Sequence, residues 1–263
     1  MATGLARAGI RRRSRQESRP AVSGCSPVAA LPEDSARVIT GLLPPLQGEV
    51  RFCGNALSPA LANRGREQLR SIQMIYQKPD VALNPRQKIA EIVGRPLEFY
   101  LGLKGVEKAT KINRLLEQIE LPTDYADRYP AQLSGGEKQR ICIARALAAE
   151  PDLIICDEVT SALDQLVAEG ILELLQDLQN QLGVSYLFIT HDLATVKAIA
   201  DSIVVMHQGR VVEQGPKAEI LSPPHEAYTE LLLSSVPEMD PDWLDTLVER
   251  RKRGELPTIE SIN

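Results

Sequence analysis

The feature that most constrains the fold of this chain is a continuous apolar run, PDLIICDE at 151–158, which ends in two carboxylates. Such a run is typical of a strand covered on both faces inside a parallel sheet, with charge emerging at its carboxyl end. A second such strand, VSYLFIT, is predicted at 184–190, with helices at about 164–182 and from Asp192. Strands that alternate with helices predict an α/β fold with a largely parallel sheet.

Further elements are predicted on both sides of this unit. They are a short helix in 35–43, strands at 48–54 and 71–77, helices over 87–120 broken at Gly105, a helix from Ser134 to about Glu150, two short strands at 201–215, and a short amphipathic helix in the tail. Residues 1–35 differ in composition: Ala, Arg, Ser, Pro and Gly dominate, and no period persists. We expect this segment to be disordered.

Composition narrows the function classes. The chain of 263 residues is 43% hydrophobic and 25% charged, which is ordinary for a soluble globular protein. A net charge of -5 gives no electrostatic reason to expect a nucleic-acid partner. No apolar run approaches the ~18 residues that cross a bilayer. The four cysteines are scattered without metal-ligand spacing, which suits core positions in a reducing cytoplasm.

Two motifs carry chemistry. The strand ending in Asp157 and Glu158 brings two carboxylates to the sheet edge where α/β proteins bind ligands, a pattern suited to Mg²⁺ and an activated water. About twenty residues earlier, LSGGEKQR (133–140) places Ser134 as a helix N-cap with Glu137 three residues on, which predicts a capping box. The two glycines leave backbone N–H groups uncovered at a helix start, which indicates an anion site.

These blocks together resemble a known family. LSGGEKQR, followed by LIICDEVTSALD and then FITHD, resembles the ATPase subunits of ABC transporters over about 36–237. The resemblance implies an ABC-type nucleotide-binding domain at 36–237 with a helical subdomain at about 86–150, and a C-terminal extension at 238–263. It also implies ATP and Mg²⁺ as cofactors.

The resemblance implies roles for the matching residues. At the chain's own site, Asp157 holds Mg²⁺, Glu158 is the catalytic base, His191 contacts the γ-phosphate, and Gln77 senses Mg²⁺ and the attacking water.

Other matching residues serve the opposite subunit. Leu133–Glu137, including Ser134, Gly135, Gly136 and Glu137, match the signature motif, which binds the γ-phosphate of ATP held by the partner. Ser161–Asp164 match the family's loop at the interface between the two ATPase subunits, so the resemblance places Asp164 among the nucleotide-site residues.

A subfamily is also indicated. ALNPR (82–86) and SPPHEAYTELLLSSVP (222–237) resemble importers of dipeptides and oligopeptides, and related importers of nickel or glutathione share this tail. The resemblance implies membrane-spanning permease subunits and a second ATPase subunit as partners, with a solute-binding protein indirectly. It implies a peripheral location at the cytoplasmic face of the inner membrane. His207 and His225 are interpreted as structural, with no metal role.

One family feature is missing. The family carries a GxxxxGK[ST] phosphate loop before the helix that matches ARVITGLL. Aligned without gaps, its Lys falls near Pro32 and its hydroxyl near Glu33, and the first lysine of the chain is Lys78. Residues 1–35 also lack any Phe, Tyr or Trp that could stack on adenine. We therefore expect the N-terminal lobe to be incomplete and the chain's own nucleotide site to be impaired.

Several interpretations of this departure stay open. The chain is an impaired importer ATPase, a non-catalytic subunit that lends only its signature to a partner's ATP site, an interaction protein that docks on membrane subunits through about 77–150, or a frameshifted gene remnant. A nucleic-acid-linked ABC protein is disfavoured, because no large insertion or paired domain is present. Translating the gene upstream of Ala36 in all three frames separates the frameshift from a true replacement.

The missing loop generates the first prediction. We expect ATP hydrolysis by the purified chain alone to be near background, because a lysine that stabilises the transition state is absent and each ~1.4 kcal/mol lost is tenfold in rate. A phosphate-release assay checks this. Robust turnover that Glu158→Gln abolishes would contradict it.

Overall fold

The computed structural model describes residues 3–8, 22–23, 32–235 and 253. Its main sheet has the order β5-β6-β7-β1-β8-β9. The strands are β1 (Thr3–Ala8), β5 (Ile72–Ile75), β6 (Leu153–Asp157), β7 (Ser185–Thr190), β8 (Ser202–His207) and β9 (Arg210–Pro216). β6 pairs in parallel with β5 and with β7, whereas β1, β8 and β9 pair antiparallel. The predicted α/β fold is confirmed, and its parallel pairing lies in β5–β6–β7.

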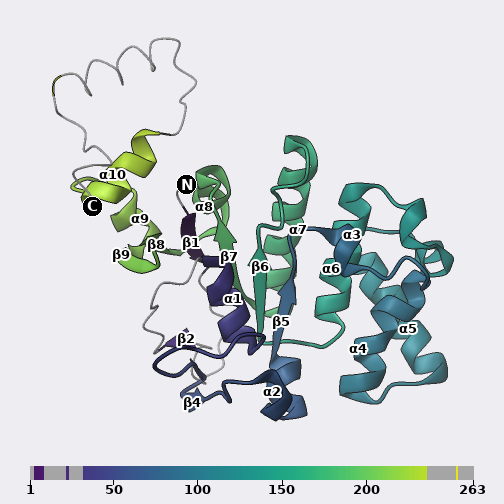
Figure 1. Ribbon diagram of the computed structural model, residues 1–263. Coiled ribbons are helices and arrows are strands. Elements are labelled where there is room, and N and C mark those ends of the chain that lie inside the picture. The colour runs from purple at the N-terminus through teal and green to yellow at the C-terminus, as the bar shows by residue number, and fades with distance from the viewer. Residues whose placement is uncertain (1–2, 9–21, 24–31, 236–252, 254–263) are drawn as a thin grey trace.

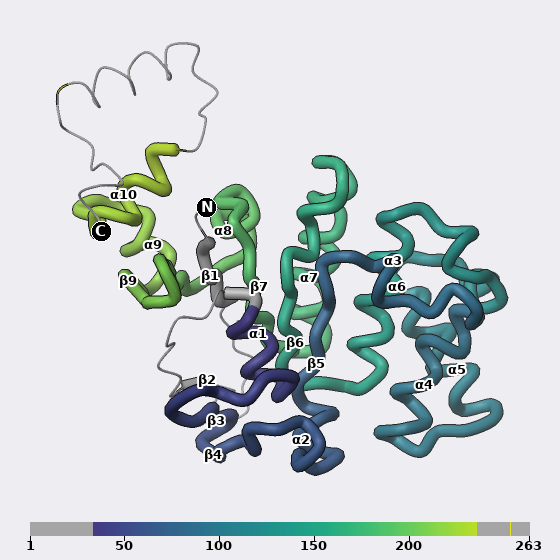
Figure 2. The backbone as a smooth tube through the Cα atoms, viewed as in Figure 1, coloured from purple at the N-terminus to yellow at the C-terminus, as the bar shows by residue number. Residues whose placement is uncertain are grey.

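Helices cover the sheet and extend beyond one edge of it (Figure 1). They are α1 (Pro32–Thr40), α2 (Arg66–Ser71), α3 (Pro79–Ala82), α4 (Ile89–Leu101), α5 (Gly105–Gln118), α6 (Gly135–Leu147), α7 (Gln165–Leu182), α8 (Leu193–Ile199), α9 (Lys217–Ile220) and α10 (Ala227–Ser234), with short 3₁₀ helices η1 (Leu61–Asn63), η2 (Thr123–Asp127) and η3 (Pro130–Gln132). Figure 2 shows α3 to α6 gathered beyond β5. α4, α5 and α6 lie in the helical subdomain predicted at about 86–150, and α3 lies just before it. The boundaries of this subdomain stay a prediction.

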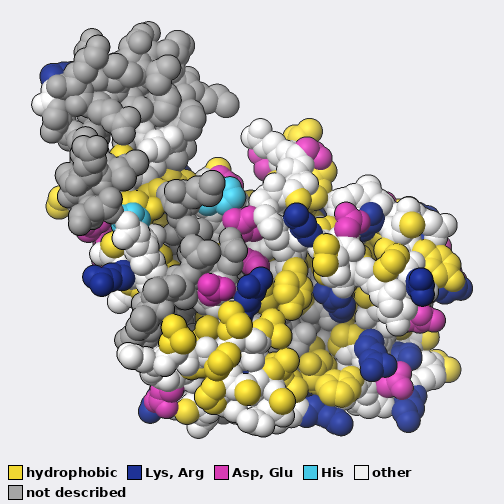
Figure 3. Space-filling model, in the orientation of Figure 1, with side chains coloured by type: hydrophobic (Ala, Val, Ile, Leu, Met, Phe, Trp, Pro, Cys, Tyr) yellow, Lys and Arg dark blue, Asp and Glu magenta, His cyan; other side chains and the backbone are white. Residues whose placement is uncertain are grey.

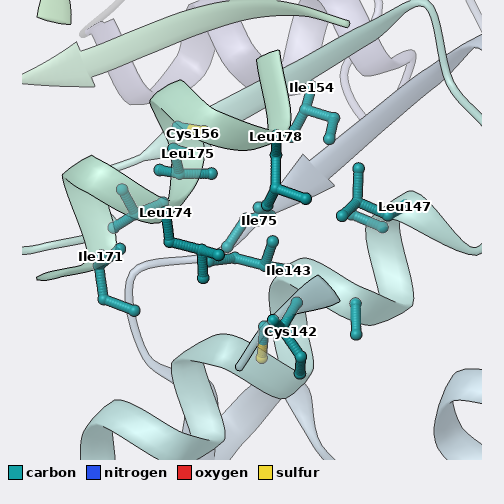
Figure 4. Packing of buried hydrophobic residues seen from close by; sticks show 14 of the residues in the cluster. Ile75, Cys142, Ile143, Leu147, Ile154, Cys156, Ile171, Leu174, Leu175 and Leu178 are labelled. Atoms are coloured by element: carbon teal, nitrogen blue, oxygen red, sulfur yellow. The ribbon is translucent and has the colours of Figure 1, made fainter. Parts of the chain in front are cut away.

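Strand β6, which lies between β5 and β7, is buried on both faces, as its apolar run predicts. Ile154 and Cys156 pack with α6 and α7 in the larger core cluster (Figure 4). Leu153 and Ile155 point to the opposite face, where they join Ala36 of α1 in a second cluster. Burial on both sides fixes the register of the strand that delivers Asp157 and Glu158.

The N-terminal segment differs from expectation. We expected no regular structure in 1–35, but the structure describes β1 and β2 (Val22–Ser23) there. β1 lies between β7 and β8, so neither of those strands is left as a sheet edge. Backbone pairing needs no particular side-chain pattern, which is why the composition did not reveal it. Residues 9–21 and 24–31 lie outside the described residues, as does the predicted tail helix.

Two predicted boundaries also differ, each because of residues with positive φ. The strand predicted at 48–54 is a hairpin of β3 (Arg51–Phe52) and β4 (Asn55–Ala56), turned by Cys53 (φ 51°) and Gly54 (φ 80°). The helix break comes at Gly102 (φ 71°), three residues before Gly105.

The structure tests the prediction that the cysteines are core residues. Cys142 and Cys156 are buried core residues, as predicted, and burial raises the pKa of the Cys142 thiol to about 11. Cys53 lies exposed in the hairpin turn, so its prediction as a core residue is wrong. Cys25 lies outside the described residues.

The burial of β6 generates a stability prediction. Ile154→Ala should lower the free energy of unfolding by about 2–5 kcal/mol, because the side chain is fully buried and its loss leaves a cavity. Urea denaturation measures the change. The matched control Val106→Ala, at a side chain that is 83% exposed, should change stability by less than about 0.5 kcal/mol. Equal effects of the two substitutions would contradict this packing.

Candidate functional site

Glu158 stands directly after β6 in a strained backbone conformation. Its φ is 48°, and its N–H donates to the carbonyl of Ile189 on β7 at 2.9 Å. The hydroxyl of Ser161 donates to the Glu158 carbonyl at 3.0 Å. The backbone on both sides of this carboxylate is therefore held by neighbours, and its side chain is only 13% exposed.

Two side chains from the segments that follow the neighbouring strands hold the carboxylate. Gln77, two residues after β5, donates from its amide Nε2 to Oε2 of Glu158 and to the Ser161 hydroxyl at 3.2 Å. His191, directly after β7, places Nδ1 2.8 Å from Oε1 of Glu158. Because β5, β6 and β7 are parallel neighbours, their carboxyl ends bring these three residues together.

Asp157 ends β6 and lines the same cleft as Glu158 and Gln77. The cleft has a volume of about 750 Å³ and also runs past α1, α2 and α3. Carboxylate and amide oxygens suit Mg²⁺, which takes few protein ligands and completes its shell with water and phosphate oxygens. In the described part of the chain, no group of three His, Cys, Asp or Glu residues gathers as a closed metal site. An open site of the Mg²⁺ type fits this donor set.

The signature residues form a second cluster, which does not line that cleft. Ser134 is the N-cap of α6: its hydroxyl accepts from the Glu137 N–H at 3.4 Å, and Oε2 of Glu137 accepts from the Ser134 N–H at 2.7 Å. The predicted capping box is confirmed. Hydrogen bonds from Tyr125 and from the Ser134 backbone lower the pKa of Glu137, so its carboxylate stays charged at the helix N-terminus.

The glycines of the signature let α6 approach the start of α7. A Cβ at Gly136 would come within 2.6 Å of Val167, and one at Gly135 would contact Leu163 at 3.7 Å. Asp164 caps α7 by accepting from the Val167 N–H at 3.1 Å. Asp164 therefore belongs structurally to the signature cluster, through its contact with Val167.

The missing loop has a structural counterpart at α1. This helix begins at Pro32, and its first turn carries Glu33 and Asp34. Asp34 lies 3.6 Å from Arg37 in an exposed ion pair. The expectation that this chain's own nucleotide site is impaired, because proline lacks an N–H and acidic residues repel phosphate, stays a prediction. The residues just before it, 24–31, lie outside the described part of the chain.

The roles assigned to these residues stay predictions, and the structure shows which of their side chains contact one another. The structure joins Glu158 directly to Gln77 and to His191, places Asp157 in the cleft that Gln77 and Glu158 line, and leaves Ser134–Glu137 and Asp164 outside the lining of that cleft. The contacts of Tyr125 with Glu137 and of Ser161 with Gln77 were not anticipated. Ser161 stands inside the matched SALD block, so a signal existed for it, whereas no motif marks Tyr125.

Family models match two parts of the chain. Residues 35–161 match the ABC transporter family, and residues 212–263 match the C-terminal region of oligopeptide/dipeptide transporters. Among known proteins, the dipeptide transport ATP-binding protein DppF of Escherichia coli is 40% identical over 84% of this chain and 66% of its own length. The oligopeptide transport ATP-binding protein OppF of Salmonella typhimurium is 42% identical over 85% of this chain and 67% of its own.

Coverage of the relatives is partial. The chain spans 60% of the length of a Brucella abortus protein named for peptide import and ATP binding, to which it is 41% identical over 76% of this chain. Among solved structures, the dimeric structure of MJ0796, a bacterial ABC transporter cassette, superposes with a TM-score of 0.59 at 28% identity, covering 70% of this chain and 79% of that one. The cbiO1 structure from Clostridium perfringens has a TM-score of 0.64 at 24% identity over 82% of each chain, which supports the fold.

The lowered pKa of Glu137 generates a pH prediction. A carboxyl whose native pKa is depressed stabilises the fold above its ordinary pKa, and this contribution is lost as pH falls through the native pKa. At pH 7, Glu137→Gln should therefore be less stable than the parent by about 0.5–1 kcal/mol, and the gap should close below about pH 4. Urea denaturation at both pH values measures it. If the difference in stability between the parent and Glu137→Gln grew in acid, the charged carboxylate would not be what stabilises the capping box.

Proposed function

The chain belongs to the ABC transporter family, and on that premise we propose that it is an ATP-binding subunit of an importer of peptides or similar small solutes. The observation that carries the proposal is the joining of Gln77, Glu158 and His191 at the carboxyl ends of three parallel strands. This arrangement suits the activation of a water molecule beside a phosphate.

The chemistry follows from the donors around Glu158. Its carboxylate accepts a proton from an attacking water, and the Gln77 amide and His191 ring hold it in place for that step. Asp157 supplies an oxygen ligand for Mg²⁺ in the same cleft. Mg²⁺, when bound, neutralises phosphate charge. These are the roles that the Glu158 cluster has where a phosphate loop holds ATP in the same cleft, and this chain has no GxxxxGK[ST] sequence to hold one.

The signature cluster gives the chain a second role, at a partner's ATP. The amide groups at the start of α6 and the Ser134 hydroxyl suit the γ-phosphate of an ATP whose phosphate loop lies on another subunit. The α1 start favours this division, because Pro32 and its acidic neighbours do not fit a triphosphate. We propose one working site, composed of this chain's signature and the partner's loop.

The proposed partners are permease subunits in the membrane and a second ATPase subunit. In the described residues, no helix has both the length and the apolar character of a membrane span. The cleft beside Gln77 has an apolar rim with Leu42 46%, Tyr76 42% and Val81 84% exposed. Figure 3 shows hydrophobic side chains gathered over the elements around α1, α2 and β5. Such a rim supports docking of the chain, as a peripheral subunit, on a permease at the cytoplasmic face of the inner membrane.

The solute class rests on the C-terminal match. Residues 212–263 match the C-terminal region of oligopeptide/dipeptide transporters, and relatives near 40% identity are named for dipeptide and oligopeptide transport. We therefore propose peptides as the solutes, delivered by a solute-binding protein.

The proposal predicts that signature variants disable the whole transporter. In the complex purified with its permease and second ATPase subunit, Ser134→Ala should lower peptide-stimulated ATP hydrolysis at least about tenfold, because a donor to the partner's phosphate is lost. Phosphate release in proteoliposomes measures it.

A matched control separates the loss of the phosphate contact from the general effect of removing a helix cap. Glu226 caps α10 by accepting from the Tyr228 N–H at 2.7 Å, outside both clusters. Glu226→Ala should leave hydrolysis within about twofold of the parent complex. Full activity of the Ser134→Ala complex would refute the proposed composite site.

A further inference from the structure

A tyrosine outside every matched motif contacts the signature. Glu137 uses both carboxylate oxygens: Oε2 accepts from the Ser134 N–H at 2.7 Å, and Oε1 accepts from the Tyr125 hydroxyl. Tyr125 lies in η2 and is 9% exposed. A single side chain from a separate element thus reaches the cap of α6.

Packing fixes the position of that hydroxyl. The Tyr125 ring belongs to the larger core cluster. The Arg128 guanidinium carbon stands 3.7 Å from the ring centroid, and Arg128 pairs with Asp124 at 2.8 Å. The ring is therefore held by its surroundings, and its hydroxyl acts as a fixed donor to a carboxylate that would otherwise rotate.

We infer that Tyr125 is a positioning residue for the signature, acting through Glu137 to hold the Ser134 cap and the N-terminal amides of Gly135 and Gly136 in place. Naming a phosphate as the group that these amides meet rests on the proposed function; the positioning itself does not. The two hydrogen bonds also hold the charged carboxylate of Glu137 in a fixed orientation, next to a helix N-terminus that attracts anions.

The charge state of Glu137 supports this role. The hydrogen bond from Tyr125 is the largest cause of the lowered pKa of Glu137, ahead of the backbone bond from Ser134. Glu137 in turn is the largest cause of the raised pKa of Tyr125. The pair therefore keeps a proton on the phenol and a charge on the carboxylate at neutral pH, which is the strong form of this hydrogen bond.

A purely structural role for Tyr125 makes a different prediction. If the ring only packs the core, removing its hydroxyl changes nothing at the signature, since Phe preserves the ring. If the hydroxyl positions Glu137, Tyr125→Phe loosens the start of α6 while the core stays intact. Tyr129→Phe is the matched control, because it removes a hydroxyl from a neighbouring ring that is 41% exposed.

Hydrogen exchange on the full-length chain tests the positioning directly. By NMR, Tyr125→Phe should speed exchange of the hydrogen-bonded amides of residues 134, 137 and 138 about tenfold. Residues 141–146 inside α6, and all of α6 in Tyr129→Phe, should keep the parent rates. In a Glu137→Ala background, Tyr125→Phe should add no further acceleration. Unchanged exchange at residues 134, 137 and 138 in Tyr125→Phe would overturn the inference.

A second readout connects positioning to the nucleotide. In the complex with the second ATPase subunit, Tyr125→Phe should raise the KM for ATP roughly fivefold and leave kcat within about twofold. An unchanged KM would overturn the functional part of the inference. If the parent complex shows no ATP hydrolysis, the proposed function fails, and the exchange rates still decide whether Tyr125 positions the signature.

Discussion

The structure depends on the parallel pairing of β6 with β5 on one side and β7 on the other. Side chains of β6 pack into a separate apolar cluster on each face, so the strand cannot shift register without exposing both. Its carboxyl end is therefore fixed, and Gln77 and His191 emerge beside it from the neighbouring strands. The hydrogen bonds around Glu158 hold a strained backbone that the sheet has already placed.

The two halves of the site have different physical origins. The cluster at Glu158 is made by long-range strand pairing, whereas the signature is made locally by a helix start, its N-cap Ser134 and close packing of Gly136 on Val167. This independence explains how a chain without a phosphate loop can keep an intact signature. Tyr125 adds a hydrogen bond to this cap from outside the motif, and we infer that it positions the signature.

Much of the fold could be predicted from sequence, because the apolar runs of β6 and β7 and the capping pattern at Ser134 are strong local signals. Turns that depend on residues with positive φ could not be predicted, because the alternation of side chains around Cys53 and Gly54 does not distinguish a strand from a tight hairpin. The place of β1 was equally hidden, because it depends on backbone pairing between β7 and β8. Motif order selected the candidate site residues, whose roles stay predictions, whereas the contact of Tyr125 with Glu137 depends on tertiary packing and carries no sequence signal.

The most direct test counts the nucleotides bound to the chain and to the chain joined with its second ATPase subunit. Equilibrium dialysis with radiolabelled ATP, in Mg²⁺-free buffer to prevent hydrolysis, gives the stoichiometry of each. A single composite site predicts no ATP on the isolated chain and one ATP per pair of subunits. Stoichiometric binding by the isolated chain, or two ATP per pair, would contradict the account.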